Sequence, residues 1–283
     1  MSNKPAMQHN SLHESSQNFP PVQTVSVVSG KGGDGRTTVA INLAISLAQK
    51  SAEVVLFDGN LSLGSIDSAL NLQQKFNIAD LVADEKNINE ISVTGPYGIT
   101  LVPGCHGNPE MSRLSQIQHQ GIINSFSQLG SAADIMLIDN EAGISRSVLD
   151  FTFAAREVLL VVCDEPASLQ NSFATIKTLS ENKGCCRFRV VTNKVSSSQH
   201  GLEIYSELCR RTDRYLDVLV EYCGCIPFDD ALAEASRAGK AITENNSGGR
   251  SARSFERLAE KIMKWPKPSS AKGHAEFFLE RLI

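Results

Sequence analysis

Residues 22–48 read VQTVSVVSGKGGDGRTTVAINLAISLA, and this stretch decides the fold. The apolar run at 22–28 predicts a strand, and the pattern at 38–48 predicts a helix. The turn between them contains Gly30, Gly32, Gly33 and Gly35. Glycines let the backbone adopt positive φ and point its N–H groups inward, and the helix N-terminus adds partial positive charge. The order strand, glycine-rich turn, helix therefore predicts a polyphosphate site, with a turn that binds no ligand as the alternative.

Short apolar runs recur along the chain, with helical patterns between them. Beyond the first run they lie at 54–59, 99–104, 134–139, 157–164, 188–193 and 221–227. These runs predict about seven strands, and their continuous Val, Ile and Leu content indicates strands that are covered on both faces. The sequence thus predicts an α/β fold with a mainly parallel sheet between helical layers, and a ligand at the carboxyl ends of the strands.

Composition favours a single globular domain with short tails. The chain has 283 residues, of which 41% are hydrophobic and 20% charged, enough for one large core. We expect the domain at 22–265, preceded by a polar disordered leader at 1–21 that lacks the apolar region of a signal peptide. Seven cysteines without a CxxC pair predict a reducing compartment and buried thiols in place of metal ligands.

Charge is distributed unevenly along the chain. The net charge is -4, yet residues 250–283 contain eight Lys or Arg against four Asp or Glu. A basic end on an acidic body indicates an anionic partner, either a membrane surface or another protein, although solvated helix faces give similar counts.

The segment 266–283 is predicted to form a linker and a C-terminal amphipathic helix. Its apolar residues follow helical spacing: Phe277, Phe278, Leu279, Leu282 and Ile283. Such a helix could bind a membrane surface. Because Glu276 and Glu280 outnumber Arg281 on the polar side, docking on the protein's own body or on a partner is the alternative.

The loop resembles that of the MinD and ParA branch of P-loop NTPases, whose pattern is KGGxGKT. The matching residues are Lys31, Gly32, Gly33, Gly35 and Thr37. The resemblance implies a P-loop NTPase fold that binds ATP or ADP with Mg²⁺. In that family the first lysine, here Lys31, reaches across a nucleotide-sandwiched dimer, Thr37 holds the metal and Thr38 adds a nucleotide contact.

Two residues of the loop depart from the family. Arg36 replaces the P-loop lysine, and a planar guanidinium is no substitute for a compact ammonium in a site shaped for a point charge. Asp34 replaces a small apolar residue, so we expect a carboxylate beside the phosphates and repulsion between like charges.

The segment at 58–60 resembles the family's DxD switch. Asp58 matches the aspartate that supports the metal, while capping of the following helix is the alternative role for it. Asn60 stands where the catalytic aspartate is expected. An asparagine can bind a water but cannot accept its proton, and a positioned base contributes ~10²–10⁴-fold to a rate.

Three further segments resemble the family's nucleotide site. Asp139 and Gly143 match the second metal aspartate and the glycine whose N–H faces the γ-phosphate, with Glu141 as an extra acidic residue between them. Asn193 and Pro227 resemble the residues on the adenine side.

Almost the whole chain, 22–283, resembles the flagellar-number regulators of the MinD type, the FleN/FlhG family. The runs that carry this likeness are 159–166, 188–190, 213–218 and 273–283. The resemblance implies an ATP-dependent monomer–dimer switch in the bacterial cytoplasm, which binds the flagellar transcription activator. It also implies work beside the polar signal-recognition-type GTPase and peripheral contact with the inner membrane at the cell pole.

The departures in the nucleotide site point to weak or lost hydrolysis. We therefore expect a regulator that acts by protein binding, as a homodimer or as a mixed dimer with a paralogue, and expect no direct nucleic-acid partner. One alternative is a working ATPase in which Arg36 contacts the phosphates. Another is a membrane-associated positioning factor for a different polar machine. An iron–sulfur reductase would need paired loop cysteines, and Cys105 stands alone.

Overall fold

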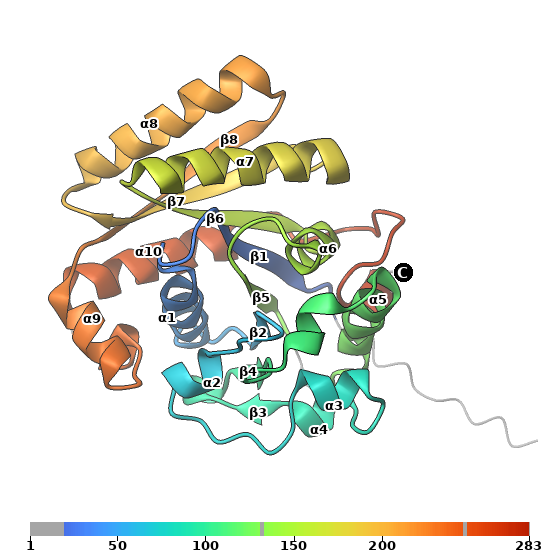
Figure 1. Cartoon of the computed structure of the whole chain (residues 1–283). Helices are drawn as coiled ribbons and strands as arrows, with labels where there is room; N and C mark the ends of the chain where they lie inside the picture. Colours follow the sequence, from blue (N-terminus) through green and yellow to red (C-terminus); the bar gives the residue numbers. More distant parts are fainter. Residues whose placement is uncertain (1–19, 131–132, 246–247, 283) are drawn as a thin grey trace, which may run out of the picture.

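A computed structural model describes residues 20–130, 133–245 and 248–282 (Figure 1). Nearly all of the predicted leader at 1–21, and Ile283, lie outside the described residues. The described chain forms one eight-stranded sheet in the order β3-β4-β2-β5-β1-β6-β7-β8. The strands are β1 (Gln23–Ser29), β2 (Val54–Gly59), β3 (Val93–Thr94), β4 (Thr100–Val102), β5 (Ile135–Asn140), β6 (Glu157–Cys163), β7 (Arg187–Val195) and β8 (Leu219–Pro227).

All seven predicted runs contribute a strand, and the pairing is parallel except between β3 and β4. The eighth strand, β3, is a two-residue edge strand. So short an element has no periodicity that a sequence could reveal, which explains why about seven strands were expected. The α/β fold with a mainly parallel sheet is confirmed.

Ten α-helices lie among the described residues, and most of them cover the two faces of the sheet. They are α1 (Arg36–Ala48), α2 (Ile66–Ala69), α3 (Ile78–Val82), α4 (Ile88–Ile91), α5 (Gln116–Ser125), α6 (Arg146–Ala154), α7 (Pro166–Lys183), α8 (Ser198–Tyr215), α9 (Asp230–Arg237) and α10 (Arg250–Met263). Among the described residues, no helix combines the length and apolar character needed to cross a membrane.

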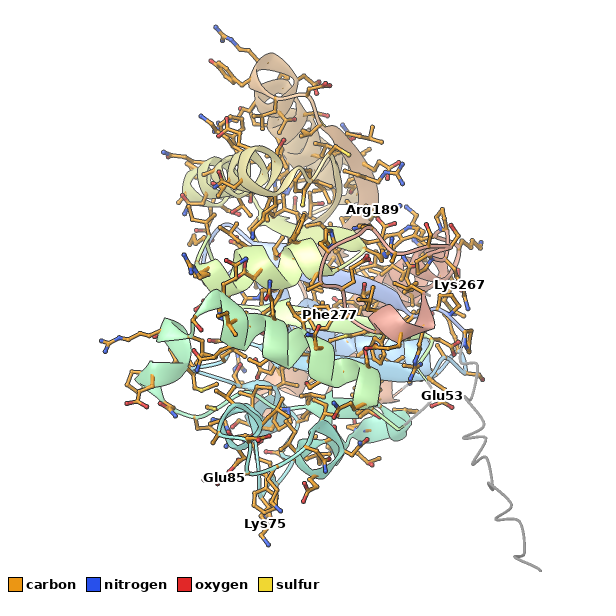
Figure 2. All side chains as sticks on the ribbon, turned by 90° about the vertical axis from the view of Figure 1, so that its right-hand side faces the viewer. Glu53, Lys75, Glu85, Arg189, Lys267 and Phe277 are labelled. Carbon is orange, nitrogen blue, oxygen red and sulfur yellow. The ribbon has the colours of Figure 1, made fainter. Side chains whose placement is uncertain are left out.

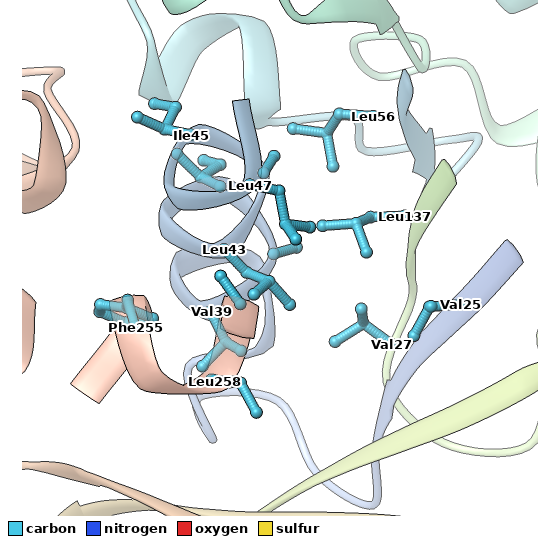
Figure 3. Packing of buried hydrophobic residues seen from close by; sticks show 14 of the residues in the cluster. Val25, Val27, Val39, Leu43, Ile45, Leu47, Leu56, Leu137, Phe255 and Leu258 are labelled. Atoms are coloured by element: carbon cyan, nitrogen blue, oxygen red, sulfur yellow. The ribbon is translucent and has the colours of Figure 1, made fainter. Parts of the chain in front are cut away.

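The first core lies between the sheet and the helices α1 and α10. Figure 3 shows Val27 and Leu137 of the central strands facing Leu43 of α1, with Phe255 of α10 beside them, and all four are fully buried. On the opposite face, α5 and α6 cover β2 and β5, while α7 and α8 cover β6 and β7. Burial on both faces explains why these strands are continuous apolar runs.

The predicted C-terminal helix is wrong for the described residues. The segment after α10 contains only a 3-10 turn at Leu279–Arg281, and Phe278 has a φ of 57°, which no right-handed helix accommodates. Phe277 and Phe278 are 2% and 1% exposed. The C-terminal segment therefore docks on the protein's own body, which was one of the alternatives that the sequence left open.

Aromatic packing and one ion pair hold this segment in place. The ring centroid of Phe277 lies 5.2 Å from that of Phe126 and 6.4 Å from that of Phe57. Arg156 and Glu276 form an ion pair of 2.7 Å in which the carboxylate is 1% exposed. Figure 2 shows Phe277 well inside the outline of the molecule, whereas Lys75 projects from its edge. The C-terminal segment is thus part of the second core.

Candidate functional site

The glycine-rich loop joins β1 to α1 at the carboxyl edge of the sheet. Gly33 and Gly35 have φ of 91° and 86°, which side chains rarely tolerate. At Gly30 a Cβ atom would lie 2.3 Å from the backbone nitrogen of Ser172 on α7. At these three positions the loop conformation requires glycine, whereas Gly32 has open space around it.

Arg36 and Thr37, at the start of α1, both bind Asp139 at the end of β5. The Arg36 Nε donates to Asp139 Oδ1 at 2.7 Å, and the Thr37 hydroxyl donates to Oδ2 at 2.6 Å. The arginine side chain is 10% exposed and the aspartate 1% exposed. This arrangement exists because β5 is the neighbour of β1, so that Asp139 emerges beneath the loop. Thr38 is half-buried one residue further along α1.

Asp58 lies directly beside Asp139, because the two are register partners in the parallel strands β2 and β5. Its carboxylate accepts backbone hydrogen bonds from Asn60, Ser65 and Ile66 at 3.2, 2.7 and 3.0 Å. Burial, followed by the charge of Asp139, raises the pKa of Asp58 to about 7. Burial also raises the pKa of Asp139, against the opposing effect of Arg36. Two of these donors, Ser65 and Ile66, stand at the start of α2. Asp58 therefore caps the following helix, which was the alternative role considered for it.

The predicted metal ligands Thr37, Asp58 and Asp139 are brought together, and all three side chains already take part in hydrogen bonds within the protein. Both oxygens of Asp139 already accept hydrogen bonds, one of them from a guanidinium that neutralises its charge. Both oxygens of Asp58 accept from backbone N–H groups. Mg²⁺ keeps several of its waters, so Asp139 would hold it through water, as the resemblance implies, and the Arg36 guanidinium competes with the cation for that carboxylate.

The residues predicted to act on water and on the γ-phosphate are engaged in local bonds. The Asn60 side chain donates to the carbonyl of Leu63 at 3.1 Å. The backbone N–H of Gly143 donates to the carbonyl of Ser29 at 3.1 Å, and Gly143 has a φ of 93°. Glu141 accepts from the hydroxyls of Ser145 and Ser147, close to the start of α6. Their roles in catalysis stay predictions.

Lys31 forms an ion pair with Glu165, the residue before α7. The hydrogen bond between them raises the pKa of Lys31 and lowers that of Glu165. Sequence reasoning missed Glu165 as a site residue. The available signal was its position after β6, because β6 is the other neighbour of β1 and its carboxyl end meets the same loop.

Asp34 does not point its carboxylate into open solvent at the loop. It is 1% exposed and accepts from the hydroxyl of Ser168 in the first turn of α7 at 3.0 Å. Burial raises its pKa. The side chain is thus tied to a helix N-terminus, where negative charge is stabilised, and its closeness to a bound phosphate stays a prediction.

Asn193 lies near the carboxyl end of β7, and Pro227 is the last residue of the adjacent strand β8. The Asn193 side chain donates to the backbone carbonyl of Asp34 at 2.8 Å, so it braces the loop. Lys194 also donates to the loop, at the carbonyl of Gly33 over 2.7 Å. Pro227 lies next to α10, with its carbonyl 3.5 Å from the Ser251 hydroxyl. The strands thus bring Asn193 to the loop, and contact of either residue with a base stays a prediction.

Comparison with known proteins agrees with this geometry. The family described as the CobQ/CobB/MinD/ParA nucleotide binding domain matches residues 25–242. The chain belongs to the MinD/ParA family. Within it, the chain is 40% identical to the antiactivator FleN of Pseudomonas aeruginosa over 93% of this chain and 94% of that protein.

Two more distant MinD/ParA relatives are similar over most of the chain. The flagellum site-determining protein YlxH of Helicobacter pylori is 26% identical over 77% of this chain and 74% of its own length. The septum site-determining protein MinD of Pyrococcus horikoshii, solved in complex with Mg-ADP, superposes with a TM-score of 0.70. That match covers 86% of this chain and 96% of the other, at 21% identity, and it shows a common fold.

Proposed function

We propose that this MinD/ParA protein is a FleN/FlhG-type regulator of flagellar number that acts by binding other proteins. The observation that carries the proposal is the likeness to the antiactivator FleN, which spans 93% of the chain. By this analogy the first partner is the flagellar transcription activator, and the polar signal-recognition-type GTPase is a second. The active form is a homodimer or a mixed dimer with a paralogue, in the bacterial cytoplasm and at the cell pole.

We further propose that ATP hydrolysis is weak or lost. The Arg36–Asp139 ion pair, 2.7 Å long and nearly buried, supports this view because it neutralises the carboxylate that the family uses for magnesium. Asn60 adds to it, since an amide cannot take a proton from water. A bound nucleotide would then set the oligomeric state without being hydrolysed.

A titration of the purified protein with Mg-ATP and Mg-ADP, with sizing in each state, tests the nucleotide proposal. Micromolar binding with dimer formation and without turnover is the expected result. Steady turnover that disappears in Asp139→Ala would overturn it in favour of a working ATPase in which Arg36 contacts the phosphates.

Deletion of the gene tests the regulatory proposal separately. Cells that lack the protein are expected to carry an altered number of flagella, and an unchanged number would contradict the proposal. The positioning-factor alternative relied on an exposed C-terminal apolar face. The burial of Phe277 and Phe278 gives that alternative no support.

A further inference from the structure

A groove runs between α8 and α10 across β8, the strand at one edge of the sheet. Two adjoining cavities of about 390 and 230 Å³ form it, and they share the lining residues Ser198, Cys225, Ser254 and Arg257. The helices α8 and α10 pack on opposite faces of the sheet, so the groove opens at the sheet's edge.

One wall of the groove is strongly basic. Arg250, Arg253 and Arg257 follow one another at helical spacing on α10, and all three are exposed. Within the described residues none of them forms an ion pair or a side-chain hydrogen bond, although Arg250 acts on Asp229 and Arg257 acts on Glu260 at longer range. Three unpaired arginines on one helix face repel one another, and an anionic ligand would relieve that repulsion.

The floor is apolar, and the opposite wall combines Leu202 of α8 with the serines at 196–198. Cys223 and Leu258 are 5% and 3% exposed at the floor, and Leu202 of α8 is 41% exposed at the rim. A phosphate backbone would use the arginines but gain nothing from this floor, and a flat bilayer surface cannot enter a recessed groove. The combination matches a chain that carries both negative and apolar side chains.

The length of the basic wall indicates the length of that chain. Lys261 extends the basic wall, and its ammonium donates to the Cys223 carbonyl at 2.7 Å. The stripe from Arg250 to Lys261 spans eleven residue steps, roughly 16 Å at the rise of an α-helix. An extended peptide rises about 3.3 Å per residue, so about five residues would cover the stripe. We propose that the groove between α8 and α10 binds a short extended segment of a partner protein in which acidic and apolar residues alternate. The proposal does not rest on the nucleotide site or on a flagellar role.

Binding of a fluorescein-labelled ten-residue peptide of alternating Asp and Leu tests the proposal, measured by anisotropy with the full-length protein. The variant Arg250→Glu/Arg253→Glu/Arg257→Glu is expected to bind at least about tenfold more weakly, because like charges then face each other. The matched control Arg237→Glu/Lys240→Glu/Lys264→Glu has the same net charge, alters exposed basic residues outside the groove, and is expected to bind like the native chain.

The rate of cysteine alkylation is a second, independent measurement of peptide binding in the groove. Cys225 lines the groove and is half-buried, whereas Cys186 is exposed and lies outside it. The Asp-Leu peptide is expected to slow the reaction of Cys225 with a maleimide and to leave that of Cys186 unchanged, as read by peptide mass spectrometry.

Three results would overturn the proposal. The first is equal peptide affinity in the native chain and in the groove variant. The second is absence of peptide binding at millimolar concentration. The third is tighter binding of a twenty-nucleotide single strand than of the peptide, lost in the groove variant, which would assign the arginines to a phosphate backbone. Thermal unfolding of each variant checks that these exposed substitutions leave the fold intact.

Discussion

The edge of the sheet that carries the glycine-rich loop and the C-terminal segment differ in how sequence specifies structure. At the edge, the loop glycines and Thr37 lie where the motif predicts, because a strand, a turn and a helix follow one another within a few residues. At the C-terminus, helical spacing predicted an amphipathic helix, but the described segment is not helical and the rings of Phe277 and Phe278 enter a distant core. The conformation of the loop follows from its local sequence. The place where a short apolar segment is buried depends on the surface that the rest of the fold exposes to it.

The largest expected effect lies at the C-terminal segment. Phe277→Ala should reduce the free energy of unfolding by about 3–5 kcal/mol, because it leaves a cavity among buried rings. Glu280→Ala, on the exposed part of the same segment, is the control and should change it little. Denaturant unfolding measures both. Equal stability of the two variants would mean that the segment is detached in solution, and the comparison would fail.

The next largest effect is expected on the rate of ATP hydrolysis at the glycine-rich loop. The double variant Arg36→Lys/Asn60→Asp should hydrolyse ATP faster than Arg36→Lys alone by about 10²-fold or more, because it regains a positioned carboxylate base. Phosphate release in the presence of Mg²⁺ measures the rate. If the two variants are equally slow, Asn60 is not the residue that limits hydrolysis, and the family's roles do not transfer to this edge.

The dependence of nucleotide affinity on Mg²⁺ tests the proposed role of Arg36. In the native chain, Arg36 neutralises Asp139, so nucleotide affinity should be nearly the same in Mg²⁺ and in EDTA. In Arg36→Lys the carboxylate becomes available, and Mg²⁺ should strengthen binding by about tenfold, which is about 1.4 kcal/mol. A fluorescent ATP analogue reports the affinity. A strong magnesium effect in the native chain would contradict a stable Arg36–Asp139 pair.

The buried aspartates predict a smaller effect of pH on stability. The pKa of Asp58 is raised from 3.8 to about 7, so the folded chain keeps a proton that the unfolded chain loses between these values. Stability should therefore fall as pH rises from about 5 to 7, with a slope of at most ~1.4 kcal/mol per pH unit from this group. Asp58→Asn should have a flatter profile. Parallel profiles of the two proteins would show that Asp58 is ionised throughout.

The smallest effect is expected at Lys31. Its partner Glu165 is exposed, and surface ion pairs contribute little to stability, so Glu165→Gln should leave the melting temperature unchanged. The variant frees Lys31, and ATP-dependent dimers, measured by light scattering, should form at lower protein concentration. A lower melting temperature of Glu165→Gln would mean that the Lys31–Glu165 ion pair stabilises the fold and does not control dimer formation.

By itself the sequence determined the α/β fold, the seven longer strands and the positions of the loop glycines. These follow from apolar runs, from the strand–turn–helix order and from φ values that only glycine adopts easily. It also indicated that Arg36 alters the site, because its chemistry differs from that of lysine wherever it points.

Only the tertiary structure decided which groups meet. Strand order placed Glu165 beside Lys31, and parallel register placed Asp58 beside Asp139. Packing of distant segments buried the C-terminal rings and left the arginines of α10 without an ion pair to any described residue beside the edge strand. The physical reason is that these contacts join residues far apart in the chain, and their energies depend on burial and neighbouring charge, which a linear pattern does not contain.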